Sequence, residues 1–191
     1  MSNRFGLSSV RSFAAVILTA AIAVGCSAAE PLPKIGEEAK DFELKAIGGE
    51  KTKLSKLSES GPVVLVVLRG YPGYQCPICT KQFAELRGKA DELKKAGAQV
   101  VLIYPGPAEG LNEKAGEFVK GKDYPAHFTI LLDPDYAFSI LYGLRWNAKN
   151  ETAYPSTFVI DSKGKIAYSK VSKTHGDRAK MEDVLKALSA K

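Results

Sequence analysis

Residues 65–79 read LVVLRGYPGYQCPIC and place two cysteines, Cys76 and Cys79, directly after an apolar segment. Beyond them, the apolar positions 79, 83, 86, 90 and 93 are four, three, four and three residues apart, as on one face of a helix. We therefore predict a buried strand followed by a helix over residues 77–96. Pro77 suits the first turn of that helix, because the N–H that proline lacks has no partner there.

Both thiols lie at the start of this helix, where free backbone N–H groups and the helix dipole favour a thiolate. We expect Cys76 to be the exposed thiol and Cys79 the more buried one. A zinc half-site would need two further ligands, and only His127 and His175, which we interpret as surface residues, are present. A structural disulfide across three residues would close too small a loop to stabilise much. The pair is interpreted as redox-active, with no metal and no bound cofactor.

The first 25 residues carry Arg4 and Arg11, no acidic residue, and an apolar run over residues 13–24. That run is too short to span a bilayer and fits the apolar part of a signal peptide. Residues 23–26 read AVGC and resemble the lipobox of bacterial lipoproteins, which implies Cys26 as a lipid anchor. Cleavage by an ordinary signal peptidase after residue 29 is the alternative. We predict export to the bacterial cell envelope, membrane-anchored or otherwise periplasmic.

The length of 191 residues, with 45% hydrophobic residues, suits one globular domain. We predict a signal peptide of the lipoprotein type over residues 1–25, a Pro-bearing tether over 26–38 and the domain over 39–191. Loss of residues 1–25 lowers the net charge from +6 to +4, because two basic and no acidic residues go with them. The remaining charges are dispersed, so we expect no nucleic-acid partner and contact with a membrane through the lipid anchor only.

The expected elements begin with a hairpin that pairs residues 41–44 with 51–54. Strands over 63–68 and 100–104 flank the helix and make a βαβ unit. Further helices are expected over 112–120, 135–142 and 177–188, and further strands over 128–132, 157–160 and 165–169. This order predicts an α/β fold, a three-layer α/β/α sandwich with an N-terminal β-hairpin. The active site should then lie at the carboxyl end of the first parallel strand.

From about residue 33 to 190 the chain resembles the thioredoxin superfamily. Within it, the chain is similar to the alkyl hydroperoxide reductase and thiol-specific antioxidant family, the redoxins and peroxiredoxins. The resemblance rests on IG at 35–36, DF at 41–42, LLDPD at 131–135 and AYPSTFVID at 153–161. Pro72, Cys76 and Cys79 also match the peroxiredoxin motif P-x-x-x-T/S-x-x-C, with a cysteine in place of the Thr or Ser.

The resemblance implies two mechanisms for the same dithiol. In the peroxidase mechanism, Cys79 attacks a peroxide and Cys76 condenses with the sulfenic acid to give a disulfide, which a thioredoxin-like reductant resets. In the alternative, a thiol-disulfide oxidoreductase acting on exported proteins, Cys76 attacks a substrate disulfide and Cys79 resolves the mixed disulfide. We favour the peroxidase, so the expected substrate is a peroxide, with a disulfide as the alternative.

Four residues are candidates for substrate binding: Pro72, Arg69, Tyr71 and Pro155. Pro72 belongs to the motif, and Tyr71 beside it could line the mouth of the site. Pro155 stands where the similar peroxiredoxins have an arginine, and it matches the cis-proline of the thioredoxin superfamily, beside which a substrate chain can pair. Arg69, at the end of the strand that leads to the motif, could replace the missing arginine and lower a thiol pKa by its charge.

Two other classes of protein stay open at this point. One is a copper carrier on the thioredoxin fold that would use two cysteines and a histidine, although the C-x-x-C spacing fits it poorly. The other is a binding module in which the C-x-x-C is inert.

Overall fold

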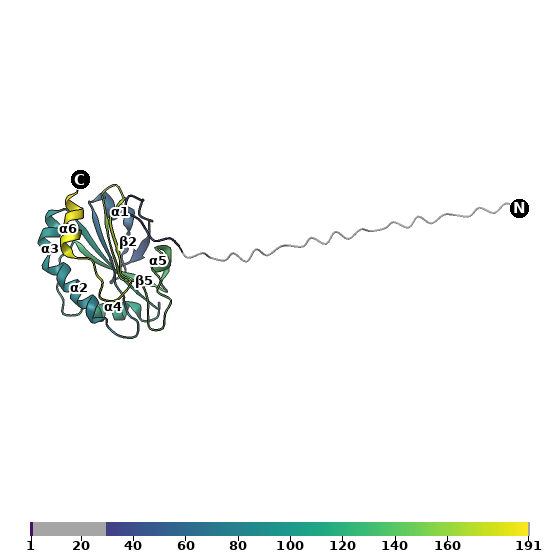
Figure 1. The fold of residues 1–191 in the computed structure, drawn as a ribbon. Coiled ribbons are helices and arrows are strands. Elements are labelled where there is room, and N and C mark those ends of the chain that lie inside the picture. The colour runs from purple at the N-terminus through teal and green to yellow at the C-terminus, as the bar shows by residue number, and fades with distance from the viewer. Residues whose placement is uncertain (2–29, 191) are drawn as a thin grey trace.

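A five-stranded mixed sheet forms the centre of the molecule (Figure 1), in a computed structural model that describes Met1 and residues 30–190. The strands are β3 (Val63–Val67), β4 (Gln99–Gly106), β5 (Phe128–Pro134), β6 (Ser156–Ile160) and β7 (Ile166–Val171). Their order across the sheet is β5-β4-β3-β6-β7. β3, β4 and β5 run parallel, whereas β6 pairs antiparallel with both β3 and β7. The predicted βαβ unit and late hairpin are confirmed.

Six helices and a small hairpin complete the described chain. The hairpin joins β1 (Glu43–Lys45) to β2 (Lys51–Lys53). The helices are α1 (Leu54–Glu59), α2 (Pro77–Gly88), α3 (Ala90–Lys95), α4 (Leu111–Val119), α5 (Ala137–Leu141) and α6 (Met181–Ser189). The single helix expected over residues 77–96 is therefore two, because the chain leaves helical geometry at Lys89, with φ −108° and ψ 12°. The preceding Gly88 has a low helix propensity and favours this break.

The sheet buries side chains on both faces. Every residue of β3 is fully buried, with Val64 and Val66 on one face and Val63, Leu65 and Val67 on the other. The first face packs against α2, α3, α4 and α6, and the second against α1, α5 and the segment that leads into the hairpin. Figure 1 shows α2, α3 and α6 together on one side of the sheet and α5 on the other. The predicted three-layer α/β/α sandwich with an N-terminal hairpin is confirmed.

The chain before the hairpin lies along the edge of the sheet, beside the start of β7. Gly36 N donates to Ile166 O at 2.8 Å, Ile166 N donates to Glu37 O at 3.0 Å, and Ala39 N donates to Gly164 O at 2.9 Å. β7 is an edge strand, so its outer backbone groups are free to pair in this way. The end of the segment expected as a tether over 26–38 is thus bonded to the domain, and residues before 30 lie outside the described residues.

Candidate active site

The two cysteines lie at the N-terminus of α2, close to the carboxyl end of β3. Cys76 is the N-cap residue, and its Sγ accepts a hydrogen bond from Cys79 N at 3.4 Å. The loop before it is held by Gln75, whose side-chain amide donates to Lys114 O and accepts from the Tyr104 hydroxyl, both at 2.8 Å. Helix start and loop together fix the position of both sulfur atoms.

Both thiols are buried, so the expectation of an exposed Cys76 is wrong. Cys76 is 2% exposed and Cys79 is 1% exposed. Cys76 packs in the same core cluster as Phe83 and Leu86 of α2. A large substrate therefore cannot reach either sulfur atom without a movement of the surrounding chain.

Two donors contact the Cys79 sulfur atom. Arg69 N–H, directly after β3, lies 3.3 Å from Cys79 Sγ, and Nη2 of Arg178 lies 3.6 Å from it. Arg178 belongs to the segment between β7 and α6, so two distant parts of the chain meet at this atom. N–H donors and a positive charge both stabilise a thiolate more than a thiol.

The two thiols share one hydrogen bond, which shifts their pKa values in opposite directions. Donation by the Cys79 thiol lowers the pKa of Cys76 to about 5; burial opposes this shift, whereas the Cys79 N–H and the charges of Arg178 and Arg69 add to it. The same hydrogen bond, together with burial, raises the pKa of Cys79, and Arg178 opposes that rise. At neutral pH the pair therefore holds one proton and one negative charge, with the charge resting on Cys76.

This electrostatic arrangement gives a pH prediction for the reduced protein. The pKa of Cys76 is about 5, below the ordinary thiol value of 9.0, so the thiolate is present above pH 5 and is lost as pH falls through it. The thiolate also stabilises the reduced fold, and this stabilisation decreases as the pH falls from 9.0 to about 5. Absorbance of the thiolate at 240 nm should titrate with a midpoint near 5. A Cys79→Ala control loses the donor and should titrate at higher pH, and a wild-type midpoint near 9 would contradict the prediction.

The Arg69 side chain turns away from the thiols into a buried ion pair. Its Nε donates to Glu151 Oε2 at 2.7 Å and its Nη2 donates to Glu151 Oε1 at 3.1 Å. Nη2 also donates to Asn150 O at 2.7 Å, and Nη1 bonds to the Tyr74 hydroxyl. Of the Arg69 groups, the backbone N–H is the one that bonds to sulfur. The Arg69 guanidinium, which the sequence suggested as a substrate-binding group, is therefore already bonded to Glu151.

His175, interpreted from the sequence as a surface residue without a role, belongs to the same network. Its Nε2 lies 3.0 Å from Glu151 Oε1, and its carbonyl accepts a hydrogen bond from Nε of Arg178 at 2.8 Å. His175 thus connects the Arg69–Glu151 pair to the segment that carries Arg178.

Tyr71 and Pro72 lie in the loop between β3 and α2 and are partly buried. Tyr71 N donates to Pro105 O at 3.1 Å, and Nζ of Lys114 lies 5.5 Å from the centre of the Tyr71 ring. Gly70 precedes them with φ +67°, and a Cβ atom there would lie 2.0 Å from the same Pro105 oxygen. The loop thus runs in close backbone contact with β4.

Pro155 is buried at the start of β6, and its peptide bond is not cis, since no cis bond occurs in the described part of the chain. The expected likeness to a cis-proline is therefore wrong. The flanking backbone groups are already paired: Tyr154 N donates to Leu144 O, and Ser172 N donates to Pro155 O, both at 2.8 Å. These bonds leave no free backbone edge beside the proline for a substrate chain.

Sequence reasoning missed Arg178 and Gln82. Gln82, one turn after Cys79 on α2, accepts a hydrogen bond from Nη1 of Arg178 at 2.6 Å. Both are buried or partly buried polar side chains that contact the dithiol region. Gln82 at 79 + 3 could have been found from helical spacing, whereas nothing near Arg178 in the sequence indicates its contact. Within residues 30–190, no group of three or more His, Cys, Asp or Glu side chains could hold a metal ion.

Fold and site together define a thiol-dependent oxidoreductase with a thioredoxin-like fold. The chain belongs to the AhpC/TSA family, whose model matches residues 35–169. It is 33% identical to peroxiredoxin Bcp of Escherichia coli K12 over 141 residues, 71% of this chain and 83% of the relative. The expected membership of the peroxiredoxin family is therefore confirmed, and the chain is a peroxiredoxin-like oxidoreductase.

Two solved structures extend this likeness. Peroxidoxin BcpB from Mycobacterium tuberculosis superposes with a TM-score of 0.65 and 28% identity, covering 83% of this chain and 97% of that one. A putative thiol:disulfide interchange protein DsbE from Chlorobium tepidum gives 0.61 and 26%, covering 82% and 99%. The family implies a peroxide substrate and a thiol reductant.

The predicted location in the bacterial cell envelope is wrong, because the curated relatives are Bcp peroxiredoxins and contradict it. The prediction depended on the composition of a short apolar run, which is weak evidence for export. The supposed signal peptide over 1–25 and the lipid anchor Cys26 lie outside the described residues. In the part of the chain that the structure describes, the helices are too short or too polar to cross a bilayer.

Proposed function

We propose that the protein reduces hydroperoxides with Cys79 as the attacking thiol and Cys76 as the resolving thiol. One observation carries this assignment: Cys79 Sγ accepts a hydrogen bond from Arg69 N–H and is also contacted by the Arg178 guanidinium. Cys79 also occupies the cysteine position of the peroxiredoxin motif, seven residues after Pro72. A sulfur atom with a donor and a fixed positive charge is suited to attack an oxygen atom.

The shared hydrogen bond supplies a route to the Cys79 thiolate. The Cys76 thiolate accepts the Cys79 proton, so the negative charge moves to the sulfur atom that faces Arg178. Cys79 then attacks the peroxide, an S–O bond forms, the O–O bond breaks, and the leaving oxygen takes up a proton from solvent. The Cys76 sulfur displaces hydroxide from the Cys79 sulfenic acid, its proton goes to that hydroxide, and a disulfide and water result. Two equivalents of an external thiol reduce the disulfide.

Thiol-disulfide exchange is the second candidate. The low pKa of Cys76, at about 5, favours it, because Cys76 is the first residue of the C-x-x-C. The likeness to the putative DsbE of C. tepidum also supports it. Against it stand the burial of Cys76 and the paired backbone on both sides of Pro155, since a protein disulfide needs an accessible sulfur atom and room for a chain.

Trapping of the sulfenic acid separates the two candidates. Reduced Cys76→Ser and Cys79→Ser variants receive one equivalent of hydrogen peroxide and a sulfenic-acid probe, and mass spectrometry locates the adduct. We expect a fast adduct on Cys79 in the Cys76→Ser variant and a slow reaction in the other variant. Oxidation of both at the rate of a free cysteine would reject the peroxidase assignment and leave disulfide exchange as the function.

A further inference from the structure

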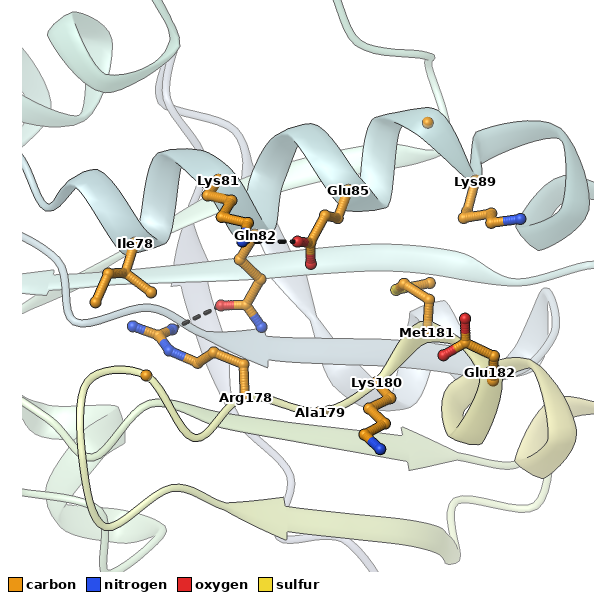
Figure 2. A pocket seen from close by; sticks show the side chains of 12 residues that line it. Ile78, Lys81, Gln82, Glu85, Lys89, Arg178, Ala179, Lys180, Met181 and Glu182 are labelled. Carbon is orange, nitrogen blue, oxygen red and sulfur yellow. Dashed lines mark hydrogen bonds and ion pairs between the residues drawn. The ribbon is translucent and has the colours of Figure 1, made fainter.

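Arg178 reaches the active site from the far end of the chain. Its guanidinium is fixed from three directions: Nε donates to His175 O at 2.8 Å, Nη1 donates to Gln82 Oε1 at 2.6 Å, and Nη2 lies 3.6 Å from Cys79 Sγ. Figure 2 shows the guanidinium directed at Gln82 across the space between α2 and the segment that leads into α6. The side chain is thus held in place and not merely near the sulfur atom.

The charge of Arg178 has no carboxylate partner among the described residues, in contrast to Arg69. The Arg69 guanidinium is neutralised by Glu151 at 2.7 Å and is bonded to two further groups. A carboxylate that pairs with an arginine cancels most of the electrostatic field of the guanidinium at a third group. An arginine that bonds to neutral oxygen atoms has no such cancellation. Arg178 is therefore the cation that acts on the Cys79 sulfur atom.

A cavity of about 520 Å³ adjoins this arginine. Arg178 and Gln82 form part of its lining, together with Ile78 and Met181 (Figure 2). Cys79 itself is 1% exposed, so the guanidinium lies between the cavity and the sulfur atom that it contacts. A guanidinium carries five N–H groups, and three of the Arg178 groups are in use, which leaves N–H groups for a small ligand.

We propose that Arg178 is a catalytic residue that holds the Cys79 thiolate and binds the peroxide from the cavity side. The inference rests on the proposed function and adds the group that receives the substrate. While the S–O bond forms and the O–O bond breaks, the electron pair goes to the leaving oxygen, and the free N–H groups of Arg178 stabilise that developing alkoxide until solvent protonates it. The substrate is therefore a small or narrow hydroperoxide whose oxygen atoms can reach the guanidinium.

Three variants test this inference: Arg178→Met, Arg178→Lys and, as a matched control, Lys186→Met. Lys186 lies in α6, is exposed and carries the same charge, but it does not line the cavity. Stopped-flow mixing of the reduced proteins with hydrogen peroxide gives the second-order rate constant. In a Cys76→Ser background, absorbance at 240 nm gives the pH midpoint of the Cys79 thiolate. We expect Arg178→Met to lower the rate constant by about 100-fold and to raise the midpoint. Arg178→Lys should regain part of both, and Lys186→Met should match the wild type.

The two readouts keep this inference separate from the proposed function. A wild-type rate no faster than that of free cysteine would reject the peroxidase function, and the pH midpoint would still decide whether Arg178 holds the thiolate. An unchanged midpoint in Arg178→Met overturns the inference. If the wild type reacts fast, an unchanged rate constant in Arg178→Met overturns it as well. Arg178→Lys serves as the test if the Met variant fails to fold, because it keeps a positive charge but not the planar group with its three bonded nitrogens.

Discussion

The Gly70→Ala variant is expected to lose about 3–5 kcal/mol of the free energy of unfolding. Gly70 has φ +67°, and an added Cβ atom would lie 2.0 Å from the Pro105 carbonyl oxygen and 2.8 Å from Pro105 Cδ. Neither atom belongs to a flexible side chain, because the oxygen accepts the Tyr71 N–H and Pro105 is part of β4. The loop between β3 and α2 would have to move away from the sheet. Urea denaturation of the reduced protein measures the loss.

Gly121→Ala is the matched control for this substitution. Gly121 has φ +69°, almost the same as Gly70, but a Cβ atom there meets nothing within 4 Å. It should therefore cost only the backbone strain of a left-handed alanine, about 1 kcal/mol. Equal losses in the two variants would show that the contact with Pro105 has no energetic weight.

The Glu151→Ala variant is expected to lose about 3 kcal/mol, because it leaves the buried Arg69 guanidinium without its anion. The side chains of the pair are 4% and 11% exposed, and the carboxylate also bonds to His175. Thermal or urea unfolding measures the loss. The variant should also react more slowly with peroxide, because His175 is one of the three groups that hold Arg178.

Two further variants give this prediction its controls. Glu43→Ala removes the partner of Lys51 in a pair whose side chains are 46% and 66% exposed, and it should cost no more than about 1 kcal/mol. The Arg69→Met/Glu151→Leu double variant removes both buried charges and should be more stable than Glu151→Ala alone. The buried pair would have to be judged unimportant if Glu151→Ala cost as little as Glu43→Ala.

Most of the fold could be predicted because it depends on local patterns. An uncharged β-branched run gave β3 as a strand buried on both faces, and the spacing of Cys79, Phe83, Leu86, Ala90 and Leu93 gave the buried face of the next helices. All five of these side chains are buried. The break at Lys89 was not predicted, since the apolar spacing continues across it while the backbone does not.

The details of the site could not be predicted in the same way, because they depend on contacts between distant segments. The sequence separates Arg178 from Cys79 by 99 residues, and no pattern around position 178 indicates a cysteine. Arg69 was a reasonable candidate by its position after β3, but the direction of its side chain is decided by Glu151, 82 residues further on. The backbone pairing of Tyr154 with Leu144 and of Pro155 with Ser172 likewise joins separate segments.

The shared proton of the dithiol also bears on how readily the enzyme is reset. A site that holds its reduced form as a thiolate, with a pKa of about 5 in place of 9.0, stabilises that form relative to the disulfide. At pH 7 this stabilisation is roughly a hundredfold, which for a two-electron couple raises the reduction potential by ~60 mV. The disulfide formed after each turnover is thus easier for an external thiol to reduce than it would be with an ordinary thiol pKa. The hydrogen bond between the two thiols, which supplies the route to the Cys79 thiolate, therefore also favours the return half of the cycle.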